Sequence, residues 1–175
     1  MSRRTATLLL ALSACLFATA ALRRDRRVVD VAEAGDPRSE ASHGYDGVGA
    51  VVGVADGKPF RQAHGWMHYS LATFDDTEVT IAGTFVGLDS SGRGVSRSYD
   101  VVVEDRLVAS RTFTAPPGAQ SVVEFAVPFA LTRGKTHIAI VIRARGGPTP
   151  ALRELRTIQD HYEVDPLMSP LGVAR

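Results

Sequence analysis

Cysteine, lysine and asparagine are scarce or missing in this 175-residue chain. Its one cysteine, Cys15, lies in an apolar N-terminal segment, so the rest of the chain has no disulfide and no thiol chemistry. The chain has no asparagine and therefore no N-glycosylation acceptor. Arginine supplies nearly all of the basic charge, since Lys58 and Lys135 are the only lysines. The net charge of +1 gives no electrostatic reason to expect nucleic acid or an acidic membrane face as a partner.

Helical periodicity is missing as well. Outside the N-terminal segment, no stretch carries an apolar stripe at 3.6-residue spacing over three turns. The chain is 45% hydrophobic and 22% charged, which is ordinary for a globular protein with a sizeable core. Its length, less a leader, suits one domain.

The first 22 residues have the pattern of an export signal. Arg3 and Arg4 precede an apolar run over residues 5–22, and Ala18-Thr19-Ala20 offers a small-x-small cleavage site. We therefore expect the folded part to be exported, as a secreted, periplasmic or cell-surface protein. Membrane contact is expected only through this segment.

Two alternatives to cleavage remain for the same segment. Residues 12–15 (Leu-Ser-Ala-Cys) resemble a lipobox, which would make Cys15 a lipid anchor. The apolar run is also barely long enough to span a bilayer. In that case Arg23 and Arg24 would favour a cytoplasmic location for the folded part, which conflicts with simple secretion.

From Gly65 onward the chain alternates between β-strand patterns and turns. Segments near 65–71, 78–86, 98–105, 122–128 and 137–144 place apolar residues at every second position. The residues expected to face inward are Met67, Tyr69, Leu71, Val79, Ile81, Gly83, Phe85, Tyr99, Val101, Val103, Val123, Phe125, Val127, Ile138, Ile140 and Ile142.

Turn residues separate these segments at 89–94, 116–118 and 132–135, and residues 146–150 end the dense β region. We predict an all-β, jelly-roll-like antiparallel β-sandwich over residues 23–164. In this prediction residues 23–57 form a lead-in whose only β-prone stretch is 28–31, and residues 165–175 form a loose tail.

A series of motifs resembles one known module. They are SEASH (39–43), FRQAHGWMHYSL (60–71), TFVGLDSSGR (84–93), RSYDVVVEDRLVASRTF (97–113), EFAVPFALTRGK (124–135) and IAIVIRARGG (138–147). In this order they resemble the C-terminal β-sandwich of bacterial β-L-arabinofuranosidases, glycoside hydrolase families 127 and 146. The resemblance covers about residues 28–158. Phe60, Gln62 and Phe85 depart from the family pattern, which has tryptophan, aspartate and tyrosine there.

The resemblance implies a substrate-binding module without its catalytic barrel. In the family, the nucleophilic cysteine and the zinc-binding cysteines lie on an α/α barrel that this chain lacks. We therefore expect no enzyme activity, no cofactor and no metal, and a non-catalytic carbohydrate-binding module for arabinose-containing or related glycans. The alternative is a structural or interaction domain that packs on a separate glycosidase barrel or another partner.

Four residues are candidates for carbohydrate contact. Glu40 and His43 match an acidic-histidine pair of the family and could hydrogen-bond sugar hydroxyls. Their alternative role is to tie the N-terminal segment to the sandwich. Arg61 and Trp66 flank a turn, and Trp66 lies off the inward face, where an exposed indole would stack on a sugar. Its alternative role is to seal the edge of the sandwich.

Other polar clusters favour structural roles. His64 and His68 stand about 13 Å apart on an extended strand, too far to share a metal ion. Asp75-Asp76 and Glu104-Asp105 fall at turns, where adjacent carboxylates point to opposite faces, and are expected to be solvated turn residues rather than a catalytic pair.

Overall fold

The computed structural model describes residues 22–75, 77–88 and 95–164. The chain divides into two compact units, and the unit of residues 27–159 holds the β-sandwich. The predicted signal or anchor segment, apart from Leu22, and the predicted tail of residues 165–175 lie outside the described residues. None of the described helices is long and apolar enough to cross a membrane.

Strands make up most of the described chain. The elements are β1 (Leu22–Glu33), α2 (Pro37–Ser42), β2 (Asp46–Ala55), β3 (Lys58–Ala72), β4 (Val79–Val86), β5 (Val95–Val103), β6 (Arg106–Ala115), β7 (Gln120–Val127), α3 (Phe129–Thr132), β8 (His137–Arg145) and β9 (Ala151–Val164).

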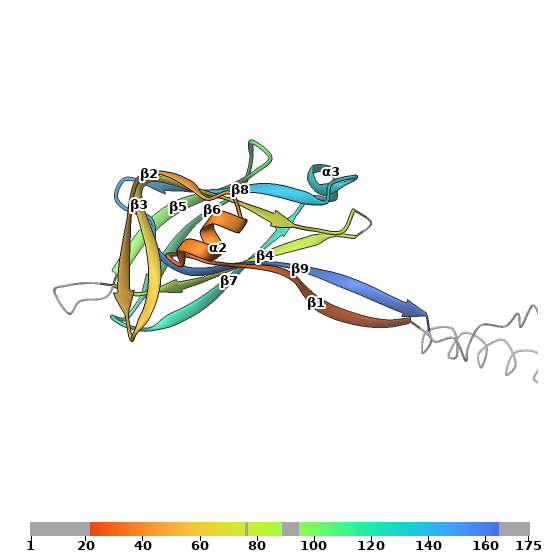
Figure 1. Ribbon diagram of the computed structural model, residues 1–175, viewed down its shortest axis with the longest axis horizontal. Coiled ribbons are helices and arrows are strands. Elements are labelled where there is room, and N and C mark those ends of the chain that lie inside the picture. Colours follow the sequence, from red (N-terminus) through yellow and green to blue (C-terminus); the bar gives the residue numbers. More distant parts are fainter. Residues whose placement is uncertain (1–21, 76, 89–94, 165–175) are drawn as a thin grey trace, which may run out of the picture. The chain divides into compact units, whose positions relative to one another are not determined.

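The strands form a jelly-roll-like β-sandwich, which confirms the predicted fold class. Hydrogen-bonded neighbours follow the order β6-β5-β8-β3-β9-β4-β7, with β1 on β9 and β2 on β3. The register joins β3 to β9 at one pair, Arg61 with Leu152, whereas β3 and β8 pair along seven residues. This single pair links two sheets, and in Figure 1 β5 and β8 lie on one side with β4, β7 and β9 on the other. The end strands β6 and β7 approach each other, so the sandwich is nearly closed.

The core is built from the residues that the period of two placed inward. Met67, Tyr69 and Leu71 are fully buried, and the matching positions of β4, β5, β7 and β8 are buried except for the half-buried Val123. Phe85 contacts the rings of Tyr99 and Phe113 at centroid distances of 5.2 and 5.7 Å, which are typical of interacting aromatic pairs. The sequence pattern therefore identified the correct face of each of these strands.

The prediction for residues 23–57 was only partly correct. The β-prone stretch 28–31 lies in β1, as expected, but the segment also contains α2 and the strand β2, which forms a hairpin with β3. The hairpin turn is Asp56-Gly57, whose φ angles of 51° and 71° are those of a type I′ turn. Asp-Gly between two β-prone runs is a strong hairpin signal, and it marks this turn in the sequence.

The prediction that the dense β region ends at residues 146–150 was wrong. β9 comes after these residues and lies between β3 and β4 in the strand order. Its run of charged residues hid the alternation, because Leu155 and Thr157 are buried between polar neighbours and Arg153 is itself buried. Period-two analysis misses a strand when buried positions are polar.

The turn predicted at Glu104-Asp105 is present, with positive φ angles of 51° and 60°. It joins β5 to β6 as a second two-residue hairpin turn. The Glu104 carboxylate is not simply solvated, since it accepts hydrogen bonds from Lys135 Nζ and the Ala139 N–H, both at 2.8 Å. Asp75 is exposed, and Asp76 lies outside the described residues.

Candidate functional site

The short helix α2 begins with a clear local signal. The Asp36 side chain accepts a hydrogen bond from the Ser39 N–H at 2.7 Å, which caps the helix, and Pro37 occupies the first turn. At the other end, the His43 carbonyl accepts a hydrogen bond from the Ser70 N–H of β3 at 2.7 Å. The helix is therefore fixed against β3, and Glu40 and His43, two of the predicted carbohydrate-contact residues, lie on it and at its C-terminal end.

Glu40 and Arg61 form a largely buried, bidentate ion pair. Arg61 donates from Nε to Glu40 Oε1 at 2.7 Å and from Nη2 to Oε2 at 2.6 Å. Oε1 also accepts the Gly35 N–H at 2.7 Å, and Glu40 is only 5% exposed. The Arg61 guanidinium lies 4.5 Å from the centroid of the Tyr45 ring, a cation–π contact. Hydrogen bonding to Glu40 raises the pKa of Arg61 further.

His43 contacts protein acceptors on both sides of its ring. Nδ1 lies 2.6 Å from the Ser39 carbonyl oxygen, and Nε2 lies 3.2 Å from Asp30 Oδ1. Asp30 in turn accepts the Ala72 N–H at 2.7 Å. Burial opposes ionisation of Asp30, but hydrogen bonds from Ala72, His43 and Val31 outweigh it and lower the pKa of this carboxyl.

The structure thus brings Glu40 and Arg61 into direct contact and connects His43 to β1 through Asp30. We call these four residues the α2 anchor. Their hydrogen-bonding groups face other parts of the protein, which is the arrangement expected of residues that hold the N-terminal segment to the sandwich. Contact with a ligand stays a prediction for Glu40, His43 and Arg61.

Trp66 lies apart from the α2 anchor in an open depression on the sheet. The depression has a volume of about 410 Å³ and is lined by Asp46, Trp66, His68, Val141 and Arg143. The strand register explains this grouping, because Trp66 pairs with Arg143 and His68 pairs with both Val141 and Asp46. Three neighbouring strands therefore supply one surface, which we call the Trp66 depression.

Two side chains of the Trp66 depression have defined hydrogen-bonding roles. His68 Nδ1 lies 3.1 Å from the Gly44 carbonyl oxygen, which can only accept, so this nitrogen carries the proton. In the neutral ring Nε2 is then an acceptor. Asp46 accepts its neighbour's N–H, from Gly47, at 2.7 Å through Oδ1 and is exposed.

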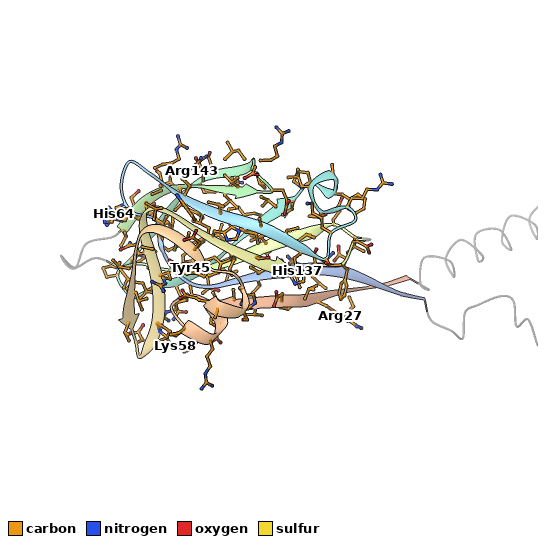
Figure 2. All side chains as sticks on the ribbon, turned by 45° about the horizontal axis from the view of Figure 1, so that its top comes forward. Arg27, Tyr45, Lys58, His64, His137 and Arg143 are labelled. Atoms are coloured by element: carbon orange, nitrogen blue, oxygen red, sulfur yellow. The ribbon has the colours of Figure 1, made fainter. Side chains whose placement is uncertain are left out.

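Arg143 is oriented by a carboxylate outside the depression. Its Nη2 lies 3.5 Å from Asp100 Oδ2, and Asp100 also accepts a hydrogen bond from Ser110 Oγ at 2.6 Å. Arg145 approaches the same carboxylate at 3.6 Å but does not line the depression. The Arg143 side chain remains 53% exposed and is therefore accessible to a ligand. Figure 2 labels Arg143 on β8.

The Trp66 depression combines a flat apolar ring with donors and an acceptor. An indole face can stack on the apolar face of a sugar ring, while a guanidinium, an imidazole and a carboxylate can bind its hydroxyls. The arrangement suits the binding of a sugar.

Sequence reasoning identified Trp66 but missed four of its neighbours. His68 was predictable, since it shares the outward face of β3 with Trp66. Val141 and Arg143 occupy outward positions that alternate with the inward isoleucines of β8, but only the β3–β8 register places them beside Trp66. Asp46 was missed because β2 was not predicted.

The described residues contain no group of three or more histidine, cysteine or acidic side chains placed to hold a metal ion. His64 and His137 lie toward opposite ends of the unit of residues 27–159, as Figure 2 shows.

A family model matches most of the chain. It describes DUF6805, a family of unknown function, and matches residues 23–158. A search of curated proteins found no match.

Several solved structures share the fold. A family 35 carbohydrate-binding module from Clostridium thermocellum is 10% identical, with 76% of this chain and 97% of that chain covered, at a TM-score of 0.53. A family 35 module from an environmental isolate is 18% identical, with 73% and 94% covered, also at 0.53. A family 115 4-O-methyl-α-glucuronidase with specificity for decorated arabinogalactans is 14% identical over 76% of this chain and 18% of its own, at 0.52. At these identities the likeness is one of fold.

Proposed function

The chain belongs to the DUF6805 family, and from this premise we propose that it is a non-catalytic carbohydrate-binding module. The observation that carries the proposal is the Trp66 depression, an aromatic ring among hydrogen-bonding side chains on an open sheet face. Two of the structures that share its fold along nearly their whole length are family 35 carbohydrate-binding modules, which supports the same function.

The ligand we propose is an arabinose-containing or related glycan. The resemblance to the substrate-binding sandwich of glycoside hydrolase families 127 and 146 supports this choice. The family 115 enzyme that shares the fold has specificity for decorated arabinogalactans, which are polymers of the same class. That specificity is a property of the enzyme, and here it only supports the choice of ligand. Export through the segment of residues 1–22, cleaved or retained as an anchor, is part of the proposal and would place the module where such polymers occur.

Binding is expected to be weak. The Trp66 depression is open and few of its side chains are desolvated, so we expect dissociation constants of roughly 0.1–10 mM. Trp66 is the only tryptophan of the chain, so its fluorescence reports on this depression alone.

The test is a titration of the chain with arabinose, arabino-oligosaccharides and galactose, followed by tryptophan fluorescence and amide chemical shifts. Trp66→Ala should abolish measurable binding while the protein stays folded. Phe74→Ala is the matched control, since Phe74 is an aromatic residue that is 56% exposed and does not line the depression. A folded chain that responds to no sugar up to about 50 mM, a limit above the weakest expected affinity, would overturn the proposal.

One observation favours the alternative of a protein-interaction domain. Four valines of β2 are exposed, namely Val48, Val51, Val52 and Val54, with exposed fractions of 49–70%. Among the described residues β2 pairs only with β3, so it is an edge strand, and uncharged apolar edges are sites where another chain can add. Under this alternative a separate glycosidase barrel would pack on β2. Val54→Lys would then abolish the complex and leave sugar binding intact.

A further inference from the structure

A second hollow lies away from the Trp66 depression, where β1, β3, β4, β7 and β9 meet. Its volume is about 370 Å³, and its lining includes Lys58, Thr84, Gln120, Arg153 and Arg156. None of these residues belongs to the Trp66 depression or the α2 anchor. We call this hollow the Arg153 groove.

Arg153 is the unusual member of the lining. It is 7% exposed, and its Nη2 donates to the Ala55 carbonyl at the tip of the β2–β3 hairpin. Its Nε and Nη1 are buried and have no hydrogen-bond partner among the described residues. Buried donors of a charged group are nearly always paired, so two unpaired ones on one guanidinium call for an acceptor.

The charge around Arg153 is incompletely balanced. The nearest carboxylate oxygen is Asp56 Oδ2 at 3.4 Å, and the Asp56 side chain is 71% exposed, so solvent screens it. Glu154 lines the groove but is paired with Arg156. Lys58 and Arg153 are left with one further lining carboxylate, Glu33, which is exposed. The lining itself carries three cations, Lys58, Arg153 and Arg156, against two carboxylates, Glu33 and Glu154, and this excess of one positive charge favours an anion.

We propose that the Arg153 groove binds the carboxylate of a sugar acid. The carboxylate lies beside Arg153 and Lys58, while Thr84 and Gln120 offer hydroxyl and amide groups to the sugar hydroxyls. Arg153 lines the groove, so in this proposal the carboxylate reaches the buried Nε and Nη1 after a local shift of the lining side chains. The inference rests on the proposed function in one respect, namely that the carboxylate belongs to a sugar.

The experiment titrates the isotope-labelled full chain with galacturonate and, as its neutral match, galactose, at constant ionic strength. The Arg153 Nε–H resonance, assigned by its absence in Arg153→Lys, and the amides of Lys58, Thr84 and Gln120 report on the groove. Tryptophan fluorescence reports separately on the Trp66 depression. We expect galacturonate to shift the groove resonances with millimolar saturation and galactose to leave them unchanged.

Two further titrations test whether the carboxylate must belong to a sugar. Acetate and a glutamate-containing dipeptide should bind at least about tenfold more weakly than galacturonate, because they lack the ring hydroxyls. Equal binding of either one would overturn the assignment to a sugar acid. Groove resonances that do not respond to galacturonate up to about 50 mM would overturn the site itself, whatever the Trp66 fluorescence shows.

A substitution at an exposed lining residue, Lys58, provides a second test of the groove if Arg153→Lys fails to fold. Lys58 is exposed, and Lys58→Gln should weaken galacturonate binding about threefold to tenfold by removing one positive charge at the rim. Lys135→Gln is the matched control, since the only other lysine pairs with Glu104 and does not line the groove. Equal effects of the two variants would contradict the proposed position of the carboxylate.

Discussion

The α2 anchor and the Trp66 depression use similar chemical groups in opposite ways. Each places a carboxylate, a histidine and an arginine beside an aromatic ring. In the anchor, both oxygens of Glu40 accept bonds from Arg61, and both ring nitrogens of His43 face protein oxygens. In the depression, His68 keeps one ring nitrogen as an acceptor, and Arg143 is half exposed.

Residue type alone therefore does not mark a binding site. What separates the two regions is whether the polar atoms are already satisfied by the protein. A group with all its bonds made inside the fold must break them to bind a ligand, whereas a half-exposed group exchanges only water. This leads to opposite expectations for mutations: changes in the anchor should alter stability, and changes in the depression should alter binding.

The largest effect is expected for Glu40→Ala. The change leaves Arg61 largely buried without its carboxylate, and removing one partner of a buried ion pair costs about 3 kcal/mol. Urea denaturation measures the loss of unfolding free energy. Arg38→Ala is the control on the same helix, because Arg38 is exposed, and it should change stability by less than about 0.5 kcal/mol. If Glu40→Ala keeps full stability but abolishes sugar binding, the anchor is a binding site after all.

Asp30 makes the stability of the anchor depend on pH. Its folded pKa lies below the usual 3.8, so it stabilises the fold above that value, and this contribution is lost as the pH falls through the folded pKa. At neutral pH, Asp30→Asn should cost about 1.5 kcal/mol, since charged acceptors form the stronger hydrogen bonds. The difference between wild type and variant should shrink as the pH is lowered below about 4, measured by urea denaturation at each pH. Glu104, whose pKa is also lowered by Lys135 and Ala139 against the effect of burial, is common to both proteins and cancels. A difference that stays constant down to about pH 2 would contradict this account.

In the Trp66 depression, Arg143→Ala should weaken glycan binding about tenfold, equivalent to about 1.4 kcal/mol, with little change in stability. Arg145→Ala is a close control, because both arginines approach Asp100 at nearly the same distance and only Arg143 lines the depression. The readout is the dissociation constant from tryptophan fluorescence. If the two variants lost similar amounts of glycan affinity, the loss would come from the contact that both arginines make with Asp100 and not from the lining of the depression.

The sequence predicted the sandwich where burial is strictly alternating. Met67, Tyr69 and Leu71 on β3 and the three isoleucines of β8 show a clean period of two, so their strands and faces were correct. β9 escaped because Arg153, Thr157 and Gln159 are buried polar residues, whose burial depends on partners from distant segments. Local periodicity carries no information about such partners.

The candidate site was predictable only in part for the same reason. Trp66 and His68 share a face of one strand, which alternation reveals. Asp46 and Arg143 join them through strand pairing, and register between distant strands is not encoded in a local pattern. Conversely, Glu40 and Arg61 are 21 residues apart, and their mutual pairing is visible only once α2 is fixed against β3.

The smallest effect is expected for Tyr45→Phe, a change at a residue that packs against the anchor. This change separates the role of the ring from that of the hydroxyl. The Tyr45 ring lies under the Arg61 guanidinium, but its buried hydroxyl has no hydrogen-bond partner in the described part of the chain. Burial raises the pKa of this hydroxyl, so it stays neutral. Tyr45→Phe keeps the ring and removes the unpaired group, and should change the free energy of unfolding by less than about 0.5 kcal/mol, measured by urea denaturation. Tyr45→Ala also removes the ring contacts with Arg61 and Tyr69 and should cost about 2 kcal/mol or more, since ring and packing are both lost. If Tyr45→Phe lowered the free energy of unfolding as much as Tyr45→Ala, the hydroxyl rather than the ring would stabilise Arg61. The anchor would then depend on a hydrogen bond of the Tyr45 hydroxyl in addition to the Glu40–Arg61 pair.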